Sequence, residues 1–184
     1  MKLTFAWLAL LALAASLAVA GTRSTTDSAA ARPAAVPVKP PAGAPFKRVV
    51  KSDEEWRRSL APDVYRVLRQ EGTEIAFTGA SWNEHRKGTY VCAGCGLALF
   101  GSDTKFDSGT GWPSFWRPAF QNYVSEKRDD TFGMVRVAVE CARCGGHLGH
   151  VFDDGPNPTG QRYCINSCAL TLDPEDGEES GEGE

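Results

Sequence analysis

The chain has 184 residues, of which 42% are hydrophobic and 10% aromatic. This length and composition allow one folded domain with tails and exclude global disorder. The formal net charge is -3, but residues 173–184 hold seven acids and no base, so the rest of the chain carries a formal charge of +4. That excess is too small to indicate nucleic-acid binding, and no nucleic acid is expected as a partner.

The N-terminal segment has the pattern of a secretory signal peptide. Lys2 precedes an apolar run over residues 3–20, which ends in the small residues Ala18-Val19-Ala20. A basic start, an apolar middle and an A-x-A ending predict cleavage after Ala20 and export to a periplasm or to the exterior. The alternative is an uncleaved anchor, because about 18 apolar residues approach the length that spans a bilayer. The small-residue ending favours cleavage, so stable membrane insertion of the mature protein is not expected.

Composition divides the rest of the chain into three parts. Residues 21–45 contain five of the eleven prolines together with many alanines, and this composition predicts a disordered linker. Residues 173–184 form an acidic tail that we also expect to be disordered. The folded domain is therefore predicted to span residues 46–172.

Two short helices are expected at the start of this domain. Ser52 stands three residues before Glu55, which is the spacing of a capping box, and this predicts a helix over residues 56–60. Pro62 suits the first turn of a second helix, which Gly72 is expected to end. One face of this second helix carries Val64, Tyr65 and Leu68.

The region after residue 89 has strand rather than helix periodicity. Valines at 135, 137 and 139 alternate with other residues, which predicts a half-buried strand. A second strand is expected over residues 162–166, with Arg162, Cys164 and Asn166 on the same face. Glycine and proline recur in the segments between the expected strands, which indicates turns. The expected fold is mainly β with short N-terminal helices.

Four of the six cysteines form two C-x-x-C pairs, each closely followed by glycine. Cys92 pairs with Cys95, and Cys141 pairs with Cys144. Two residues between cysteines let both sulfurs reach one ion, and two such pairs supply the four thiolates that suit tetrahedral zinc. A site with four cysteine ligands has no open position, so one structural zinc ion per chain is predicted. Two disulfides or a redox-active pair are the alternatives.

Two cysteines and two histidines remain after these ligands are assigned. Cys164 and Cys168 are unpaired, and His147 and His150 follow the second cysteine pair closely. Arg162 on the same strand face could favour a thiolate at Cys164, and a histidine could transfer a proton. An inert buried cysteine and a solvent-facing histidine loop are the structural alternatives. The glycine-rich segment 109–116 carries three large rings, either to bind a ligand or to cover the core.

At this point four ordered segments resemble the signature motifs of the B-type methionine sulfoxide reductases: Ser108–Phe115, Gly146–Phe152, Asp154–Pro156 and Arg162–Ser167. The two C-x-x-C pairs are similar to those of the zinc-containing members. The resemblance covers about residues 51–172. It implies two antiparallel sheets with a structural zinc site of four cysteine ligands. It also implies an oxidoreductase that reduces methionine-R-sulfoxide in proteins, recycled by a thioredoxin-like reductant.

The resemblance also implies roles for individual residues. Cys164 would be the nucleophile that attacks the sulfoxide sulfur, leaving a sulfenic acid, and a nearby acid would protonate the oxygen. Trp112 and Phe152 would contact the substrate, with the Trp112 ring against its methyl group. The polar shell around Cys164 would comprise His147, His150, Asp154, Arg162 and Asn166.

The chain departs from the family at the recycling step. Many members have their resolving cysteine where this chain has Thr110, whereas Cys168 stands where the family usually has a small residue. We therefore expect Cys168 to resolve the sulfenic acid on Cys164. A continuous strand would place the two Cα atoms about 13 Å apart, while a disulfide needs about 4.4–6.8 Å, so a turn between them is required. The alternative is attack on Cys164 by an external thiol.

Two other classes of function remain open on the residues alone. One is a zinc-stapled secreted binding module without catalysis, and the other is a secreted domain with all six cysteines in disulfides. The leading hypothesis is an exported, monomeric enzyme that repairs oxidised proteins.

Overall fold

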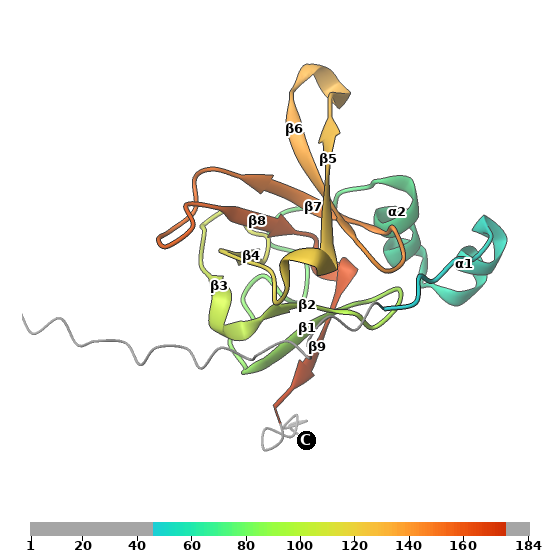
Figure 1. Cartoon of the computed structure of the whole chain (residues 1–184), viewed down its shortest axis with the longest axis horizontal. Coiled ribbons are helices and arrows are strands. Elements are labelled where there is room, and N and C mark those ends of the chain that lie inside the picture. The colour runs from blue at the N-terminus through green and yellow to red at the C-terminus, as the bar shows by residue number, and fades with distance from the viewer. Residues whose placement is uncertain (1–45, 176–184) are drawn as a thin grey trace, which may run out of the picture. The chain divides into compact units, whose positions relative to one another are not determined.

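The computed structural model describes residues 46–175. The predicted signal peptide (1–20), the linker (21–45) and tail residues 176–184 lie outside the described residues. Within residues 46–175, every helix is too short or too polar to cross a membrane. The described chain begins with two helices and continues as antiparallel strands joined by turns (Figure 1).

The two predicted helices are present as α1 (Asp53–Ser59) and α2 (Pro62–Gln70). The capping box that opens α1 is confirmed, because Ser52 and Glu55 bond each other's backbone N–H groups. α2 ends differently from the prediction. Glu71, not Gly72, adopts the left-handed conformation, with a φ of 54°. Gly72 instead lets the chain pass close to the end of α2, since a Cβ there would lie 2.9 Å from the Arg66 carbonyl oxygen.

The smaller sheet has the strand order β2-β1-β9 and is antiparallel throughout. Its strands are β1 (Gly88–Cys92), β2 (Ala98–Gly101) and β9 (Leu170–Pro174). Asp173 and Pro174 pair with Thr89 and Gly88 of β1. The folded domain therefore continues into the first residues of the segment that the sequence assigned to the acidic tail.

The larger sheet, within the described residues, has the order β3-β4-β8-β7-β6-β5 and is also antiparallel. Its strands are β3 (Lys105–Phe106), β4 (Ser114–Phe115), β5 (Val124–Asp129), β6 (Arg136–Cys141), β7 (His147–Phe152) and β8 (Arg162–Ile165). Short 3-10 turns comprise η1 (Ser102–Thr104), η2 (Gln121–Tyr123), η3 (Thr131–Gly133) and η4 (Ser167–Ala169). Two antiparallel sheets with short N-terminal helices confirm the expected fold class.

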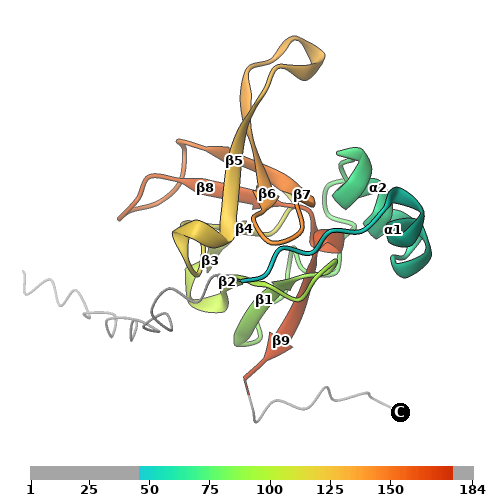
Figure 2. The same cartoon turned by 45° about the vertical axis from the view of Figure 1, so that its right-hand side comes forward.

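The strand predicted around residues 135–139 is present as β6, but its buried side differs from the prediction. Val135 is 69% exposed and Val137 37% exposed, whereas Ala138 and Val139 are buried. The cause is tertiary: the β5–β6 hairpin projects beyond the rest of the fold, as Figures 1 and 2 both show. Val135 and Val137 therefore lie beyond the edge of the core, and a register shift after Val139 interrupts the alternation of buried and exposed residues.

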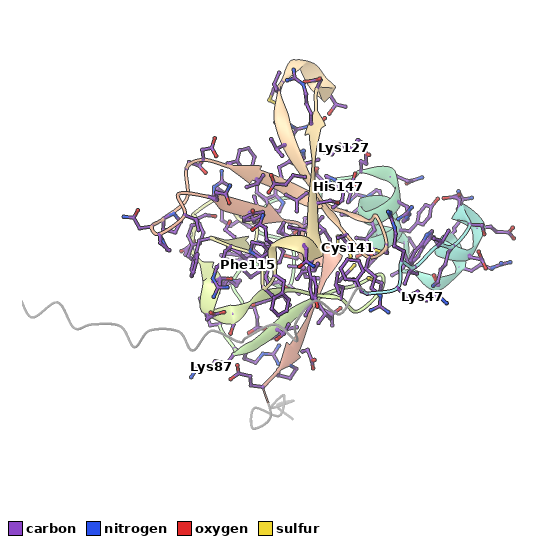
Figure 3. All side chains as sticks on the ribbon, viewed as in Figure 1. Lys47, Lys87, Phe115, Lys127, Cys141 and His147 are labelled. Atoms are coloured by element: carbon purple, nitrogen blue, oxygen red, sulfur yellow. The ribbon has the colours of Figure 1, made fainter. Side chains whose placement is uncertain are left out.

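Aromatic rings between the sheets fix the orientation of β8. Phe115 stacks on Phe100 with ring centroids 4.4 Å apart, and Tyr90 meets Phe115 edge-on at 5.1 Å. Tyr163 of β8 packs against Phe100, and Ile165 is fully buried (Figure 3 labels Phe115 in this core). Since side chains alternate along a strand, the residue between Tyr163 and Ile165 must face away from this core.

Candidate functional site

The two C-x-x-C pairs meet in space although they come from different sheets. Cys92 ends β1 and Cys141 ends β6, and the four Sγ atoms all lie within 4.8 Å of one another. The Cys92–Cys144 sulfurs are 3.8 Å apart and the Cys95–Cys141 sulfurs 3.6 Å apart. A tetrahedral ion with metal–sulfur bonds of about 2.3 Å would hold its sulfurs about 3.8 Å apart. The four cysteines therefore fit a metal ion.

The same distances argue against the disulfide alternatives. All six cysteines lie in the described residues and are free thiols. A disulfide would bring two sulfurs to about 2.05 Å, far closer than the spacing in the cluster.

Each C-x-x-C turn depends on the glycine that follows it. Gly96 has a φ of 71° and Gly145 a φ of 68°, values that favour a residue without a Cβ. In both turns the glycine N–H donates to the carbonyl of the first cysteine at 2.8 Å. The two turns thus have matching geometry, and together they connect the smaller sheet to the larger one (Figure 3 labels Cys141 near the centre of the molecule).

Cys164 lies in the middle of the larger sheet, between β4 and β7. Its Cα pairs with Ser114 on one side and with His150 on the other. Gly149 permits this close pairing, because a Cβ there would lie 2.0 Å from the Cys164 carbonyl oxygen. On the face away from the core, Cys164 opens into a cavity of about 130 Å³. The cavity lining comprises Thr73, Trp112, Arg136, Gly149, His150, Phe152, Cys164 and Asn166.

Burial and the neighbouring polar groups have opposite effects on the pKa of Cys164. Burial raises the pKa of the Cys164 thiol, and this is the largest effect. The Arg162 charge and hydrogen bonds from Thr110 and Ser114 act in the opposite direction and favour the thiolate. The expected proximity of Arg162 to Cys164 is therefore present, although in the free protein desolvation outweighs it.

His150 is the histidine that faces this cavity, and a carboxylate holds its ring. His150 Nε2 lies 2.8 Å from Asp129 Oδ2, and Arg136 donates to the same oxygen at 2.7 Å. Hydrogen bonds from Thr131, followed by the contact with His150, keep the pKa of Asp129 well below its usual range. Asp129 is thus an ionised acceptor that orients His150 and leaves its other ring nitrogen for a ligand.

His147 is not part of the cavity at Cys164. It is 5% exposed, and its ring centroid lies 5.4 Å from that of His150. It lines an adjoining cavity of about 230 Å³, which shares Thr73, Arg136 and His150 with the cavity at Cys164. Burial, aided by His150, lowers the pKa of His147 to about 4, so it is neutral near pH 7. His147, labelled in Figure 3, therefore contacts the ring of His150 but does not line the cavity at Cys164.

Arg162 and Asp154 form a pair beside the cavity. Arg162 donates to both carboxylate oxygens of Asp154, at 2.8 and 2.9 Å. The Arg162 guanidinium also lies over the Phe152 ring, 4.4 Å from its centroid. Asp154 itself is exposed, so its contribution is to hold Arg162 near Cys164 and behind Phe152.

Trp112 and Asn166 reach the cavity from two loops. The Trp112 indole N–H donates to the backbone oxygen of Glu74 at 3.3 Å. Asn166 donates from Nδ2 to the Leu148 oxygen at 2.9 Å and accepts the Glu74 N–H at 2.9 Å. Both side chains are therefore placed by backbone groups distant in sequence.

Cys168 lies on η4, the turn that the sequence required between Asn166 and Cys168. It lines a different cavity from Cys164, one of about 520 Å³. Its N–H donates to Glu74 Oε2 at 3.1 Å, and burial and the Glu74 charge raise the pKa of its thiol to about 12. A resolving role for Cys168 stays a prediction.

Sequence reasoning missed four groups at the site: Thr73, Asp129, Arg136 and Gly149. Thr73, Arg136 and Gly149 line the cavity, and Gly149 also allows the strands to approach. The alternation along β6 was the available signal for Arg136. Nothing local pointed to Asp129, which reaches His150 only through strand pairing across β6.

The arrangement combines one thiol, a carboxylate-supported histidine, an amide and two aromatic rings. The rings of Trp112 and Phe152 offer an apolar surface for a methyl group. His150 and Asn166 can hydrogen-bond an oxygen that lies next to the Cys164 sulfur. Such a site suits an apolar side chain that carries one polar oxygen atom, bonded either to sulfur or to carbon.

Comparison with known proteins identifies relatives of most of the described domain. The SelR domain matches residues 60–174. "Peptide methionine sulfoxide reductase MsrB" of Bradyrhizobium diazoefficiens is 61% identical over 127 residues, covering 69% of this chain and 91% of that protein. The Leptospira interrogans protein of that name is 58% identical over 127 residues (69% and 97%). That of Acinetobacter baumannii is 54% identical over 134 residues (73% and 96%).

Proposed function

Because the chain belongs to the SelR-domain family of B-type methionine sulfoxide reductases, it is an oxidoreductase acting on methionine sulfoxide, and we propose that Cys164 reduces the R epimer in proteins. The observation that carries this proposal is the content of one cavity. Cys164 shares it with the aromatic rings of Trp112 and Phe152 and with the polar groups of His150 and Asn166.

The proposed reaction transfers one oxygen atom from sulfur to sulfur. The Cys164 thiolate attacks the sulfoxide sulfur while His150 gives a proton to the oxygen, which is a poor leaving group until it is protonated. The attack forms a bond between the two sulfurs. The hydroxyl then passes from the methionine sulfur to the Cys164 sulfur, and the bond between the sulfurs breaks with its electron pair staying on methionine. Methionine sulfur is thereby reduced by two electrons, and Cys164 is oxidised by two electrons to a sulfenic acid. Arg162, Thr110 and Ser114 favour the thiolate form of Cys164. Asn166 holds the oxygen, and Asp129 keeps the His150 ring in place.

We assign a structural zinc ion to the cysteine cluster formed by Cys92, Cys95, Cys141 and Cys144. The sulfur spacing supports this assignment, and four cysteines leave no ligand position for substrate or water. Bound zinc would link the two sheets and hold the start of β7, the strand that carries His150. No chemical step in the proposed reaction passes through the metal.

Export is the proposed setting. The signal-peptide pattern of residues 1–20 supports it, and the substrates would then be oxidised exported proteins, repaired by a monomeric enzyme. A thioredoxin-like protein of the same compartment is the proposed reductant.

The first test is the choice between sulfoxide epimers. Purified protein should reduce an R-sulfoxide peptide and discriminate against the S epimer by at least about 100-fold. The reason is geometric: with the methyl group against Trp112, only one epimer directs its oxygen to His150 and Asn166. Chromatography of the peptide with dithiothreitol as reductant measures both rates. Equal consumption of the two epimers would contradict the proposal.

For recycling, we propose that Cys168 condenses with the sulfenic acid on Cys164, forming a disulfide and releasing water. The η4 turn supports this step because it removes the extended geometry that would separate the two residues. Thr110 occupies the position of the usual resolving cysteine and is one of the groups that favour the Cys164 thiolate. A cysteine introduced at this position therefore tests whether a resolving thiol at the usual place can replace Cys168 in the recycling step.

Replacing Cys168 with serine should leave one turnover intact but slow thioredoxin-driven cycling by at least about tenfold. The sulfenic acid should accumulate on Cys164, where dimedone labelling followed by peptide mass spectrometry detects it. Adding Thr110→Cys to this variant should restore cycling, because the new thiol lies beside Cys164. If cycling in Cys168→Ser equals that of the unmodified enzyme, the reductant acts directly on Cys164.

A further inference from the structure

The segment 73–81, which connects α2 to β1, contacts the site although it contributes no group to the proposed reaction. Glu74 is at its centre and uses both its backbone and its side chain. Its backbone oxygen accepts the Trp112 indole N–H at 3.3 Å, and its N–H donates to Asn166 Oδ1 at 2.9 Å. Its carboxylate accepts the N–H groups of Ser167 at 2.6 Å and of Cys168 at 3.1 Å. One residue therefore joins the aromatic loop, the amide of the cavity and η4.

The side chain of Glu74 anchors the segment to η4. Hydrogen bonds from backbone N–H groups to a carboxylate are among the stronger ones in proteins. The rest of the segment adds contacts with the same turn: Ser81 donates its N–H to Ser167 Oγ at 3.3 Å. At Gly79, a Cβ would lie 2.3 Å from that oxygen, so only glycine permits this approach.

The two cavity groups depend on this anchor to different degrees. Asn166 has further support, because both its N–H and its Nδ2 donate to the Leu148 oxygen at 2.9 Å. The hydrogen bond of the Trp112 indole goes to Glu74 itself. Releasing the Glu74 carboxylate from η4 would therefore displace mainly the acceptor that orients Trp112.

We propose that Glu74 is a positioning residue that holds the Trp112 ring where the substrate methyl group binds, by clamping segment 73–81 onto η4. This inference rests on the proposed function, in which Trp112 contacts the methyl group. The methyl contact exists in the bound substrate and in the transition state alike, so its loss should weaken binding without slowing the chemical step.

The test compares Glu74→Ala and Glu74→Gln with Glu74→Asp in the dithiothreitol-driven R-sulfoxide assay. For the first two variants we expect KM to rise about tenfold while kcat changes less than about threefold. Glu74→Asp keeps the charge and should recover part of the affinity. Glu54→Gln is the matched control. Glu54 is an exposed residue of α1 paired with Arg58, and its substitution should change neither constant.

A double-mutant cycle shows whether Glu74 acts through Trp112. Trp112→Ala alone should raise KM, and adding Glu74→Ala should raise it no further, because the ring that Glu74 positions is already gone. Additive effects would overturn the proposal, as would a fall in kcat at unchanged KM. An unchanged KM in folded Glu74→Ala would overturn it too.

Alkylation of Cys168 reports the clamp without any catalysis. With iodoacetamide and mass spectrometry of the resulting peptides, Cys168 should react faster in Glu74→Gln than in the unmodified protein. The substitution weakens the hydrogen bonds that hold the Ser167 and Cys168 N–H groups, so amide hydrogen exchange at these two residues, which does not depend on the charge beside the thiol, should speed up in parallel. If the unmodified protein reduces neither epimer, the proposed function fails, and alkylation still tests the clamp. If that protein is active but Cys168 reacts equally in both forms, the clamp fails and the function stands.

Discussion

Replacing Cys164 with serine should lower the rate of sulfoxide reduction by at least about 1000-fold, because a serine hydroxyl at this position has no comparable nucleophilicity. Cys164 is the thiol that opens into the cavity with Trp112 and His150, whereas Cys168 lines another cavity. Single-turnover reduction of an R-sulfoxide peptide measures the effect without the recycling step. Cys168→Ser is the control in the same assay and should complete its turnover.

The fold and the metal should be unaffected by this change. Serine differs from cysteine by one atom, and the cysteine cluster comes from other strands. Thermal melting and bound-zinc analysis of Cys164→Ser should therefore match the unmodified protein. A Cys164→Ser variant that is folded and fully active would support a different nucleophile and overturn the assignment.

Replacing Cys144 with serine should have the largest effect on stability. Structural zinc sites contribute about 10 kcal/mol or more of apparent binding free energy, which is comparable with the whole unfolding free energy of a domain, about 5–15 kcal/mol. Because the cluster joins the end of β1 to the end of β6, losing a ligand removes a link between the two sheets. The variant should lose its metal and be largely unfolded, with activity lost in parallel.

Metal analysis, circular dichroism and thermal melting measure these effects. Cys168→Ser provides the control, since it makes the same chemical change at a half-buried cysteine that lies outside the cluster. It should keep the metal and its melting temperature. A chelator should lower the melting temperature of the unmodified protein. A metal-free preparation with full stability would contradict the structural role of zinc.

Local sequence signals determined the elements that depend on neighbouring residues. The capping box of Ser52 and Glu55 and the proline at the start of α2 act within one helical turn, so their outcome did not depend on the rest of the fold. The C-x-x-C turns are equally local, because their glycines supply the left-handed backbone that follows each pair. The grouping of the four cysteines followed from the chemistry of their ligand set rather than from any predicted contact.

Tertiary packing decided which face of each strand is buried. Val135 and Val137 have the alternation of core residues, yet they lie on a hairpin that extends beyond the core. Burial is a property of what covers a side chain, and a strand pattern does not contain that information. The same limitation applies to the end of α2, where Glu71 rather than Gly72 takes the left-handed conformation.

The same distinction between sequence and tertiary structure applies to the reactive centre. The sequence by itself determined the chemistry of the site, because Cys164, His150, Trp112 and Asn166 stand in recognisable motifs, and the structure brings them to one cavity. Only the tertiary structure decided which histidine faces the thiol. It separated His147 from the cavity and brought Asp129 to His150 across paired strands.

Glu74 shows most clearly what local sequence patterns cannot reveal. Its backbone and carboxylate bind groups 38 to 94 residues away in the chain, and its own segment has neither helical nor strand periodicity. Motifs report residues whose chemistry is conspicuous, whereas a positioning residue is defined by its partners. Those partners exist only after the two sheets, η4 and the aromatic loop have come together.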